Sequence, residues 1–184
     1  MAIIVVGGSG RGVGKTALAC GLIASLREFR WTAVKITTHE HGNPKPIWEE
    51  TTAGQGSDTA RYLAAGAERA LLVTVQPEEL GQMVRPLLQP RREEEPSPHL
   101  IFESNSILDH LKPDLCLIVD GVPLAGRKVS FIAVMDRADA MVARADQDGT
   151  VEGKRPRFSL ADLQRISPEM LDWIRVRLRS NLCS

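Results

Sequence analysis

The feature that most restricts what this chain can fold into is a ten-residue stretch near its N-terminus that contains five glycines. It is the segment Gly7-Gly8-Ser9-Gly10-Arg11-Gly12-Val13-Gly14-Lys15-Thr16. A short apolar run at 3–6 precedes it, as expected of a buried parallel strand. Leucine and isoleucine then recur at intervals of three or four residues between 15 and about 30, which indicates an amphipathic helix. A glycine-rich turn therefore joins a strand to a helix.

This order of elements is typical of a loop that binds phosphate groups. Glycines let the backbone turn with positive φ and bring N–H groups close to an anion, and the helix N-terminus adds further N–H groups. Lys15 would reach the β- and γ-phosphates, and the Thr16 hydroxyl would bind Mg²⁺. The predicted contacts to a nucleoside triphosphate, GTP or ATP, are Ser9, Gly10, Arg11, Gly12, Val13, Gly14, Lys15, Thr16 and Ala17. In this loop Ser9 stands where the standard pattern has glycine, and Gly8 supplies the glycine one residue earlier.

The rest of the chain alternates apolar strands with helices. Further strands are predicted at 33–36, 70–75, 100–102, 115–119 and 129–134, with a long loop at 37–57. Helices are predicted from Asp58, as a cap, to Gly66, from Pro77, and over about 167–180. This order predicts an α/β fold of three layers, with a mostly parallel sheet covered by helices on both faces. At 184 residues, we expect a single domain over 1–184.

Charge and cysteine content restrict the setting and the partners. Lys plus Arg number 23, and Asp plus Glu also number 23. The net charge therefore gives no reason to expect nucleic acid or a membrane as a partner. The apolar start is too short for a signal peptide or a membrane span. Three scattered cysteines, Cys20, Cys116 and Cys183, favour reduced thiols and a cytoplasmic location.

Motifs beyond the loop resemble those of a known family. After the first helix come a strand ending near Lys35, a Thr/His loop, then Gly56-Ser57-Asp58 and Ala65-Gly66-Ala67, and later Glu103 followed by serine. Their order resembles the P-loop family of molybdopterin-guanine dinucleotide biosynthesis protein B and, more distantly, dethiobiotin synthetase. The family has glycine at the position of Ser104 and then a Phe-Lys segment that this chain lacks. The resemblance implies a P-loop NTPase fold, a preference for GTP and a role in molybdenum cofactor biosynthesis.

Three acids are candidates for holding Mg²⁺, which takes one or two carboxylates together with phosphate oxygens and water. Asp58 and Glu103 match motif positions of the family, and Glu103 also ends an apolar strand, where α/β sheets place their ligands. Asp120 ends another apolar strand, but the residues after it favour a turn. We predict Thr16, Asp58 and Glu103 as the metal site and Lys15, Asp58 and Glu103 as catalytic residues. Asp120 remains an alternative to Glu103.

Other residues have a functional and a structural interpretation. Arg11 would reach a phosphate of its own subunit or of a partner in a homodimer, although Gly10 stands where related dimeric ATPases carry a signature lysine. Lys35 would contact a phosphate or an acidic co-substrate, or lie on the surface. His39 and His41 would share a metal if their segment is extended, while solvated or anion-bound histidines are the more common case.

The nucleotide base has one candidate site in the sequence. The residues Asp136-Arg137-Ala138-Asp139 follow the predicted strand 129–134, where guanine-binding proteins carry Asn-Lys-x-Asp. Asp136 and Asp139 are therefore predicted to contact the base. The alternative is that these acids cap a helix over 138–143.

Three functions follow from these patterns. The leading hypothesis is a GTP-binding, slowly hydrolysing accessory protein of molybdenum cofactor biosynthesis that acts on a partner enzyme. The second is an ATP-dependent ligase or kinase acting on a small carboxylate, like dethiobiotin synthetase. The third is a metal-delivery GTPase that uses the His39 loop. All three are NTP hydrolases or phosphotransferases that depend on the same loop.

Overall fold

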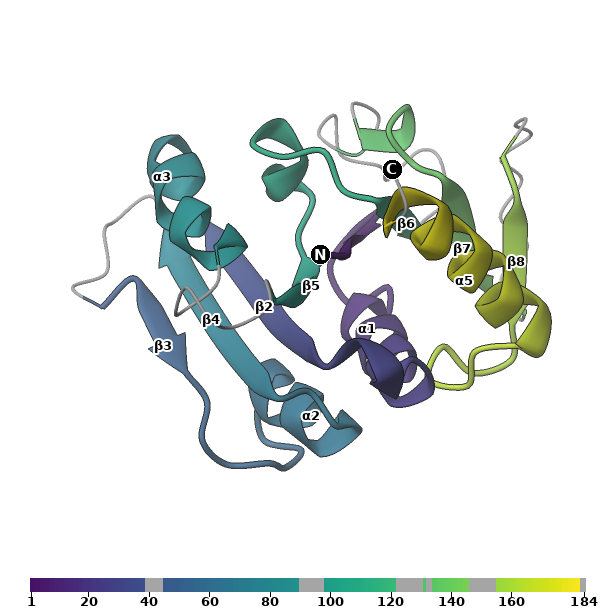
Figure 1. The fold of residues 1–184 in the computed structure, drawn as a ribbon, viewed down its shortest axis with the longest axis horizontal. Coiled ribbons are helices and arrows are strands. Elements are labelled where there is room, and N and C mark those ends of the chain that lie inside the picture. Colours follow the sequence, from purple (N-terminus) through teal and green to yellow (C-terminus); the bar gives the residue numbers. More distant parts are fainter. Residues whose placement is uncertain (39–44, 90–97, 122–130, 132–133, 146–154, 183–184) are drawn as a thin grey trace.

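The computed structural model describes residues 1–38, 45–89, 98–121, 131, 134–145 and 155–182. Within these residues, eight strands form one sheet in the order β3-β4-β2-β5-β1-β6-β7-β8 (Figure 1). The strands are β1 Ile3–Gly8, β2 Trp31–Thr38, β3 Ile47–Glu49, β4 Arg69–Val75, β5 His99–Glu103, β6 Leu115–Asp120, β7 Ala140–Arg144 and β8 Arg157–Leu160. Neighbouring strands run parallel, except that β3 pairs antiparallel with β4.

Helices cover both faces of this sheet. The α-helices are α1 Lys15–Ser25, α2 Asp58–Ala65, α3 Leu80–Val84 and α5 Pro168–Leu182, and the short 3₁₀ turns are η1 Arg27–Phe29, η2 Pro77–Glu79, η3 Arg85–Leu88 and η4 Ser106–Asp109. One buried apolar cluster joins the sheet to α1, α2 and α5, and a second joins its other face to α3 and η4. The predicted three-layer α/β architecture is therefore confirmed.

The central strand β1 explains why the glycine loop lies in the middle of the molecule. Its side chains alternate between the two apolar clusters, with Ile4 and Val6 in one and Ile3 and Val5 in the other. The strand pairs with β5 on one side and β6 on the other, and Val6 is opposite Glu103. Parallel strands end at the same side of the sheet, which we call the carboxyl edge. The glycine loop and Glu103 therefore meet there.

The N-terminus of α2 differs from the prediction, and its C-terminus agrees with it. Ser57, and not Asp58, is the N-cap: its side chain accepts a hydrogen bond from the Ala60 N–H at 3.0 Å. Asp58 is the first helical residue, so its carboxylate is available for contacts outside the helix. Gly66 ends the helix with φ of 106°, as predicted, because a left-handed C-cap favours glycine.

Two expectations for the region 129–143 are wrong. Of the predicted strand 129–134, the described residues Phe131 and Val134 are helical and buried on the α3 face. Residues three apart lie on one face of a helix, and a short apolar run does not distinguish this pattern from a buried strand. The alternative helix over 138–143 is instead strand β7, whose first four residues are buried between β6 and β8.

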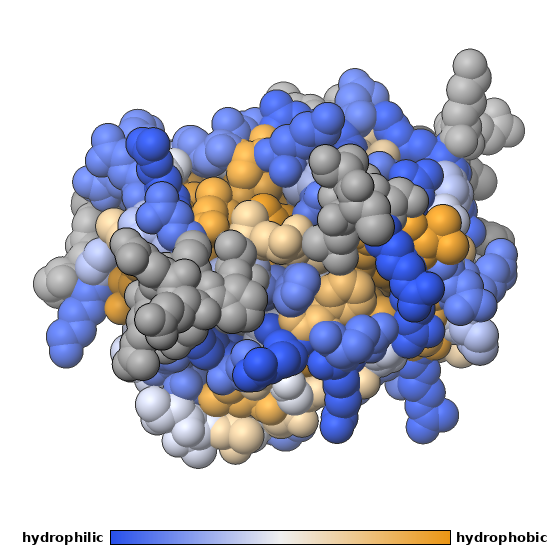
Figure 2. Space-filling view, viewed as in Figure 1, coloured by the Kyte–Doolittle hydropathy of each residue, from blue (hydrophilic) through white to orange (hydrophobic). Residues whose placement is uncertain are grey.

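The remaining differences concern short elements and the surface. Strands β3 and β8 were not predicted. The C-terminal helix was predicted; its apolar residues Met170, Ile174 and Leu178 are fully buried, and Leu171 is partly buried. None of the described helices is both long and apolar enough to cross a membrane. On the face seen in Figure 2, hydrophobic residues show in patches among hydrophilic ones, the usual surface of a folded domain.

Candidate functional site

The base of the glycine loop is tied to both neighbouring strands. The Asn105 side chain accepts a hydrogen bond from Gly8 N–H at 2.8 Å and donates one to Gly8 C=O at 3.0 Å. On the other side, Ser9 N–H donates to Val119 C=O at 2.9 Å and the Ser9 hydroxyl accepts from Gly121 N–H at 3.0 Å. Ser9 is buried, and this hydroxyl contact gives a structural role to the serine that replaces the standard glycine.

Farther along, the loop needs glycine where it turns into α1. Gly12 and Gly14 have φ of 72° and 103°, a region that other residues adopt only with strain. A Cβ on Gly14 would also lie 2.3 Å from Leu163 Cδ1. Gly14 is the N-cap of α1 and has no side chain that could accept from the first N–H groups of the helix. These N–H groups therefore face the loop, as they do at helix N-termini that bind anions.

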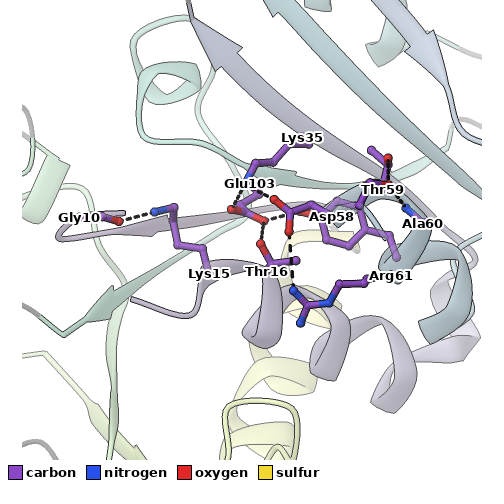
Figure 3. Close-up of polar contacts among 11 residues, drawn as sticks. Gly10, Lys15, Thr16, Lys35, Asp58, Thr59, Ala60, Arg61 and Glu103 are labelled. Atoms are coloured by element: carbon purple, nitrogen blue, oxygen red, sulfur yellow. Dashed lines mark hydrogen bonds and ion pairs between the residues drawn. The ribbon is translucent and has the colours of Figure 1, made fainter. Parts of the chain in front are cut away.

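Lys15 and Thr16, at the start of α1, point in different directions (Figure 3). Lys15 Nζ lies back over the loop and donates to Gly10 C=O at 2.6 Å. The Thr16 hydroxyl donates to Glu103 Oε2 at 2.7 Å. The lysine therefore lies against the glycine loop, while the threonine points to the carboxylate at the end of β5.

Glu103 is the centre of a compact polar cluster at the carboxyl edge. Besides Thr16, its carboxylate accepts hydrogen bonds from Lys35 on β2 and from the Tyr62 hydroxyl on α2. Lys35 Nζ also pairs with Asp58 Oδ2 at 2.9 Å (Figure 3). The register of the sheet explains the lysine contact, because Lys35 and Glu103 are directly paired residues of adjacent strands. Asp58 and Glu103 therefore lie together beside Thr16, and the prediction that these three residues hold a metal stays a prediction.

Burial and neighbouring charges shift the pKa values of Lys35, Asp58 and Tyr62 in this cluster. Burial alone would lower the pKa of Lys35, but the Glu103 and Asp58 carboxylates outweigh it and raise that pKa. Burial would likewise raise the pKa of Asp58, but Lys35 lowers it below the ordinary value. Burial, together with Glu103, raises the pKa of the Tyr62 hydroxyl well above its usual range. At neutral pH, Lys35 and Asp58 are therefore a charged pair, and Tyr62 is a neutral donor.

The donor set fits a magnesium ion better than a softer metal. Mg²⁺ prefers hard oxygen ligands and takes few protein groups because phosphate oxygens and water complete its octahedron. Two carboxylates and a hydroxyl, from Asp58, Glu103 and Thr16, supply such ligands. Within the described residues, no group of three or more His, Cys, Asp or Glu side chains forms a metal centre.

Two cavities flank the glycine loop. One, of about 400 Å³, has Lys15, Lys35, Glu103, Ser104 and Ser106 among its lining residues, and we call it the phosphate-side cavity. The other, of about 320 Å³, includes Gly14, Arg144, Asp162 and Leu163, and we call it the loop-side cavity. Arg11 lines both. The loop therefore has open space on the side of its charged cluster and on the side of β7 and β8.

The residues predicted to contact the base lie elsewhere, which corrects that prediction. Asp139 precedes β7 at the opposite, amino edge of the sheet, where its carboxylate accepts from Cys116 N–H at 2.8 Å. Asp136 lies before it and its side chain is 95% exposed. Neither acid reaches the loop, because parallel strands carry their amino ends away from it. Arg144 and Asp162, by contrast, line the loop-side cavity next to the glycine loop, and no sequence motif identified them.

Other predicted residues are also placed. Asp120, the alternative to Glu103, is buried at the end of β6 next to the loop, but the Thr16 hydroxyl bonds to Glu103. His39 and His41 lie outside the described residues. Cys20 and Cys116 are free and buried, and burial raises their pKa values to about 11 and about 12. Tyr62 and Asn105 were not predicted as site residues, since neither belongs to a motif.

Comparisons with known proteins support the fold. No protein-family model matches the sequence, and no curated protein matches it either. Among solved structures, the chain is similar to the "apo" form of LpxK from Aquifex aeolicus, crystallised in complex with ATP, with a TM-score of 0.53 and 19% identity. The match covers 85% of this chain and 53% of LpxK, so the chain spans about half of that protein's length. With its mostly parallel sheet, this protein has the α/β fold of the P-loop NTPases.

Proposed function

We propose that this protein binds a nucleoside triphosphate with Mg²⁺ at the glycine loop and transfers the terminal phosphoryl group to an acceptor. The observation that carries the proposal is the meeting of Thr16, Asp58 and Glu103 beside Lys15, at the carboxyl edge of a P-loop fold. Phosphoryl transfer needs little covalent chemistry from the protein and depends on positioning and charge stabilisation. In this cluster, Thr16, Asp58 and Glu103 would position the metal, and Lys15 would stabilise the negative charge.

Each group of the site has a role in that reaction. The loop N–H groups and the start of α1 bind the phosphate oxygens, and Lys15 leaves Gly10 C=O to contact the terminal phosphates. Thr16, Asp58 and Glu103 would hold Mg²⁺, which when bound neutralises charge on the β- and γ-phosphate oxygens. Tyr62, a neutral donor from the core, fixes the orientation of Glu103.

The phosphate-side cavity favours an acceptor other than water. Its volume of about 400 Å³ lies within the range of small-molecule sites, and since the loop residues Gly8 to Arg11 also line it, an acceptor would share it with the terminal phosphate. Hydroxyls of Ser104 and Ser106, 2.9 Å apart, and the cations Lys15 and Lys35 line it. A small polar acceptor next to the terminal phosphate is therefore the leading proposal, which makes the protein a phosphotransferase or ligase.

A second candidate is the accessory role in molybdenum cofactor biosynthesis, with GTP as the nucleotide. The resemblance to the family of molybdopterin-guanine dinucleotide biosynthesis protein B rests in part on Lys35, Asp58 and Glu103. What favours this role is that Lys35 pairs with both Asp58 and Glu103. In that role the protein hydrolyses its nucleotide slowly and acts on a partner enzyme.

Calorimetric titration tests the binding site. Wild type, Lys15→Ala and Lys112→Ala are titrated with GTP and ATP, with and without Mg²⁺; Lys112 is an exposed lysine at the amino edge and serves as the matched control. We expect Lys15→Ala to weaken binding about 100-fold, about 2.7 kcal/mol, and Lys112→Ala to bind like wild type. Equal binding by wild type and Lys15→Ala would place the nucleotide elsewhere. An affinity at least tenfold higher for GTP or for ATP identifies the preferred nucleotide base.

The acceptor is tested by following γ-labelled phosphate. Turnover that rises at least tenfold with a pool of small hydroxyl- or carboxyl-bearing molecules, and that labels one of them, supports the phosphotransferase. Slow release of inorganic phosphate that no small molecule changes, together with binding to a molybdenum cofactor enzyme, supports the accessory role instead.

A further inference from the structure

The Lys35 side chain lies within the proposed metal site. Its ammonium lies between two carboxylates, on Asp58 Oδ2 at 2.9 Å and on Glu103 Oε1. The same two carboxylates, with Thr16, form the oxygen set proposed above for the divalent cation. The Lys35 side chain is 21% exposed and that of Glu103 is 2% exposed, so the pair is largely shielded from water.

Electrostatics explains why a cation lies there. Two carboxylates this close would repel each other strongly in a partly buried site, and an ammonium between them offsets the repulsion. The lysine ammonium is a compact point charge on a flexible stem, which allows it to stand in for an ion. Lys35 and a divalent cation therefore compete for the same oxygens.

The Lys35 side chain also has space for a second conformation, in the phosphate-side cavity. The residue lines the phosphate-side cavity together with Lys15 and Arg11. The terminal phosphate of a nucleotide on the loop would bring several negative charges to this cavity. An ammonium that leaves the carboxylates can therefore find a new counter-charge within the reach of its four-carbon stem.

Resting on the nucleotide binding proposed above, we infer that Lys35 is a displaceable counter-ion. Its ammonium holds Asp58 and Glu103 together in the nucleotide-free protein, and it leaves them when the divalent cation and the nucleotide bind. It then turns into the phosphate-side cavity and contacts the phosphoryl group or the acceptor. The same charge thus keeps the empty site stable and arrives at the phosphate only when the metal is in place.

Manganese binding without nucleotide tests the competition. Free Mn²⁺ is measured by electron paramagnetic resonance for wild type, Lys35→Met, Lys35→Arg and Arg61→Met. We expect Lys35→Met to bind Mn²⁺ about tenfold more tightly than wild type, about 1.4 kcal/mol, because the competing charge is gone. Lys35→Arg keeps the charge and should bind as weakly as wild type. Arg61 pairs with Asp58 at 3.6 Å and not with Glu103, so Arg61→Met is the control for the loss of a neighbouring cation. We expect its Mn²⁺ affinity to differ from that of wild type by less than about threefold.

An unchanged or weaker Mn²⁺ affinity in Lys35→Met would mean that the lysine is a fixed support, which overturns the inference. Lys35→Met leaves the buried Glu103 carboxylate without its cation, which can destabilise the fold. A second measurement therefore uses wild type alone. In a crystal grown with Mg²⁺ and a non-hydrolysable triphosphate, we expect Lys35 Nζ to have left Glu103 for a phosphate oxygen. Nucleotide on the loop with Lys35 still on Glu103 contradicts this inference alone, whereas no nucleotide on the loop contradicts the proposed function as well.

Discussion

The two edges of the sheet carry the same types of charged residue and use them differently. At the amino edge, Asp114 accepts from Ile3 N–H and Asp139 from Cys116 N–H, both at 2.8 Å, so each acid fastens the start of a strand. At the carboxyl edge, Glu103 and Asp58 meet side chains instead: a hydroxyl, a phenol and an ammonium.

This difference shows how to distinguish a structural acid from a functional one in such a fold. A backbone N–H cannot move away without loss of the strand pairing, so an acid that accepts from it is committed to the structure. Side-chain partners can rotate away, and an acid surrounded by them can exchange them for a ligand. The following predictions test this contrast, beginning with the largest effect.

Glu103→Gln is expected to have the largest effect, on activity. Glutamine has the shape of glutamate but brings no charge to the metal site, and it leaves Lys35 paired with Asp58 alone. We expect Mg²⁺-dependent turnover to fall about 100-fold, the magnitude typical for the loss of one preorganised charge contact, with the fold retained. Steady-state turnover over a range of Mg²⁺ concentrations measures it. Asp114→Asn at the amino edge is the matched control, and similar turnover in both variants would contradict the contrast between the edges.

Asp139→Ala is expected to lower stability and to leave nucleotide affinity unchanged. The substitution removes the acceptor of Cys116 N–H and the partner of Arg177, 3.5 Å away. A buried donor without its partner costs about 1–3 kcal/mol, which urea denaturation measures. The control is Asp136→Ala, whose exposed side chain predicts a change within about 0.5 kcal/mol. A loss of nucleotide binding in Asp139→Ala would restore this acid as a base contact.

His99 at the amino edge predicts a smaller, pH-dependent effect. Burial, and then the positive charge of the N-terminus, lower the pKa of this histidine, whose Nδ1 accepts from Ala2 N–H at 3.0 Å. The unfolded chain therefore binds the proton at a higher pH than the folded one, and stability should fall as the pH drops below about 6.5. His99→Asn keeps an acceptor but does not titrate. The difference in urea midpoint between wild type and variant should change between pH 7 and pH 5.5, and a constant difference would refute the prediction.

Much of the carboxyl edge was predictable from the sequence because its signals are local. The glycine run, the lysine and threonine after it, and an acid at the end of an apolar run each lie within a few residues. The alternation of apolar strands and helices was equally local, so the α/β fold class followed. Lys35, Asp58 and Glu103 were recognised individually, but their mutual contacts depend on the strand order, which places β5 between β1 and β2.

The other half of the sheet was harder to predict for physical reasons. Strand β7 consists of Ala140-Met141-Val142-Ala143-Arg144, a sequence that does not favour a strand over a helix. Burial between β6 and β8 decides its conformation, and that burial is a tertiary effect. Tyr62 escaped notice for the same reason. It lies in a helix, and only its contact with Glu103 places it at the candidate site.

The Asn105 amide has a consequence for ligand binding. By accepting from Gly8 N–H and donating to Gly8 C=O, it imitates the peptide group of a neighbouring strand and extends the pairing of β1 by one rung. The start of the glycine loop is therefore held in place by the protein's own hydrogen bonds. The conformational entropy that an incoming triphosphate would otherwise have to remove from this segment has already been lost, so more of its interaction energy remains for tight binding.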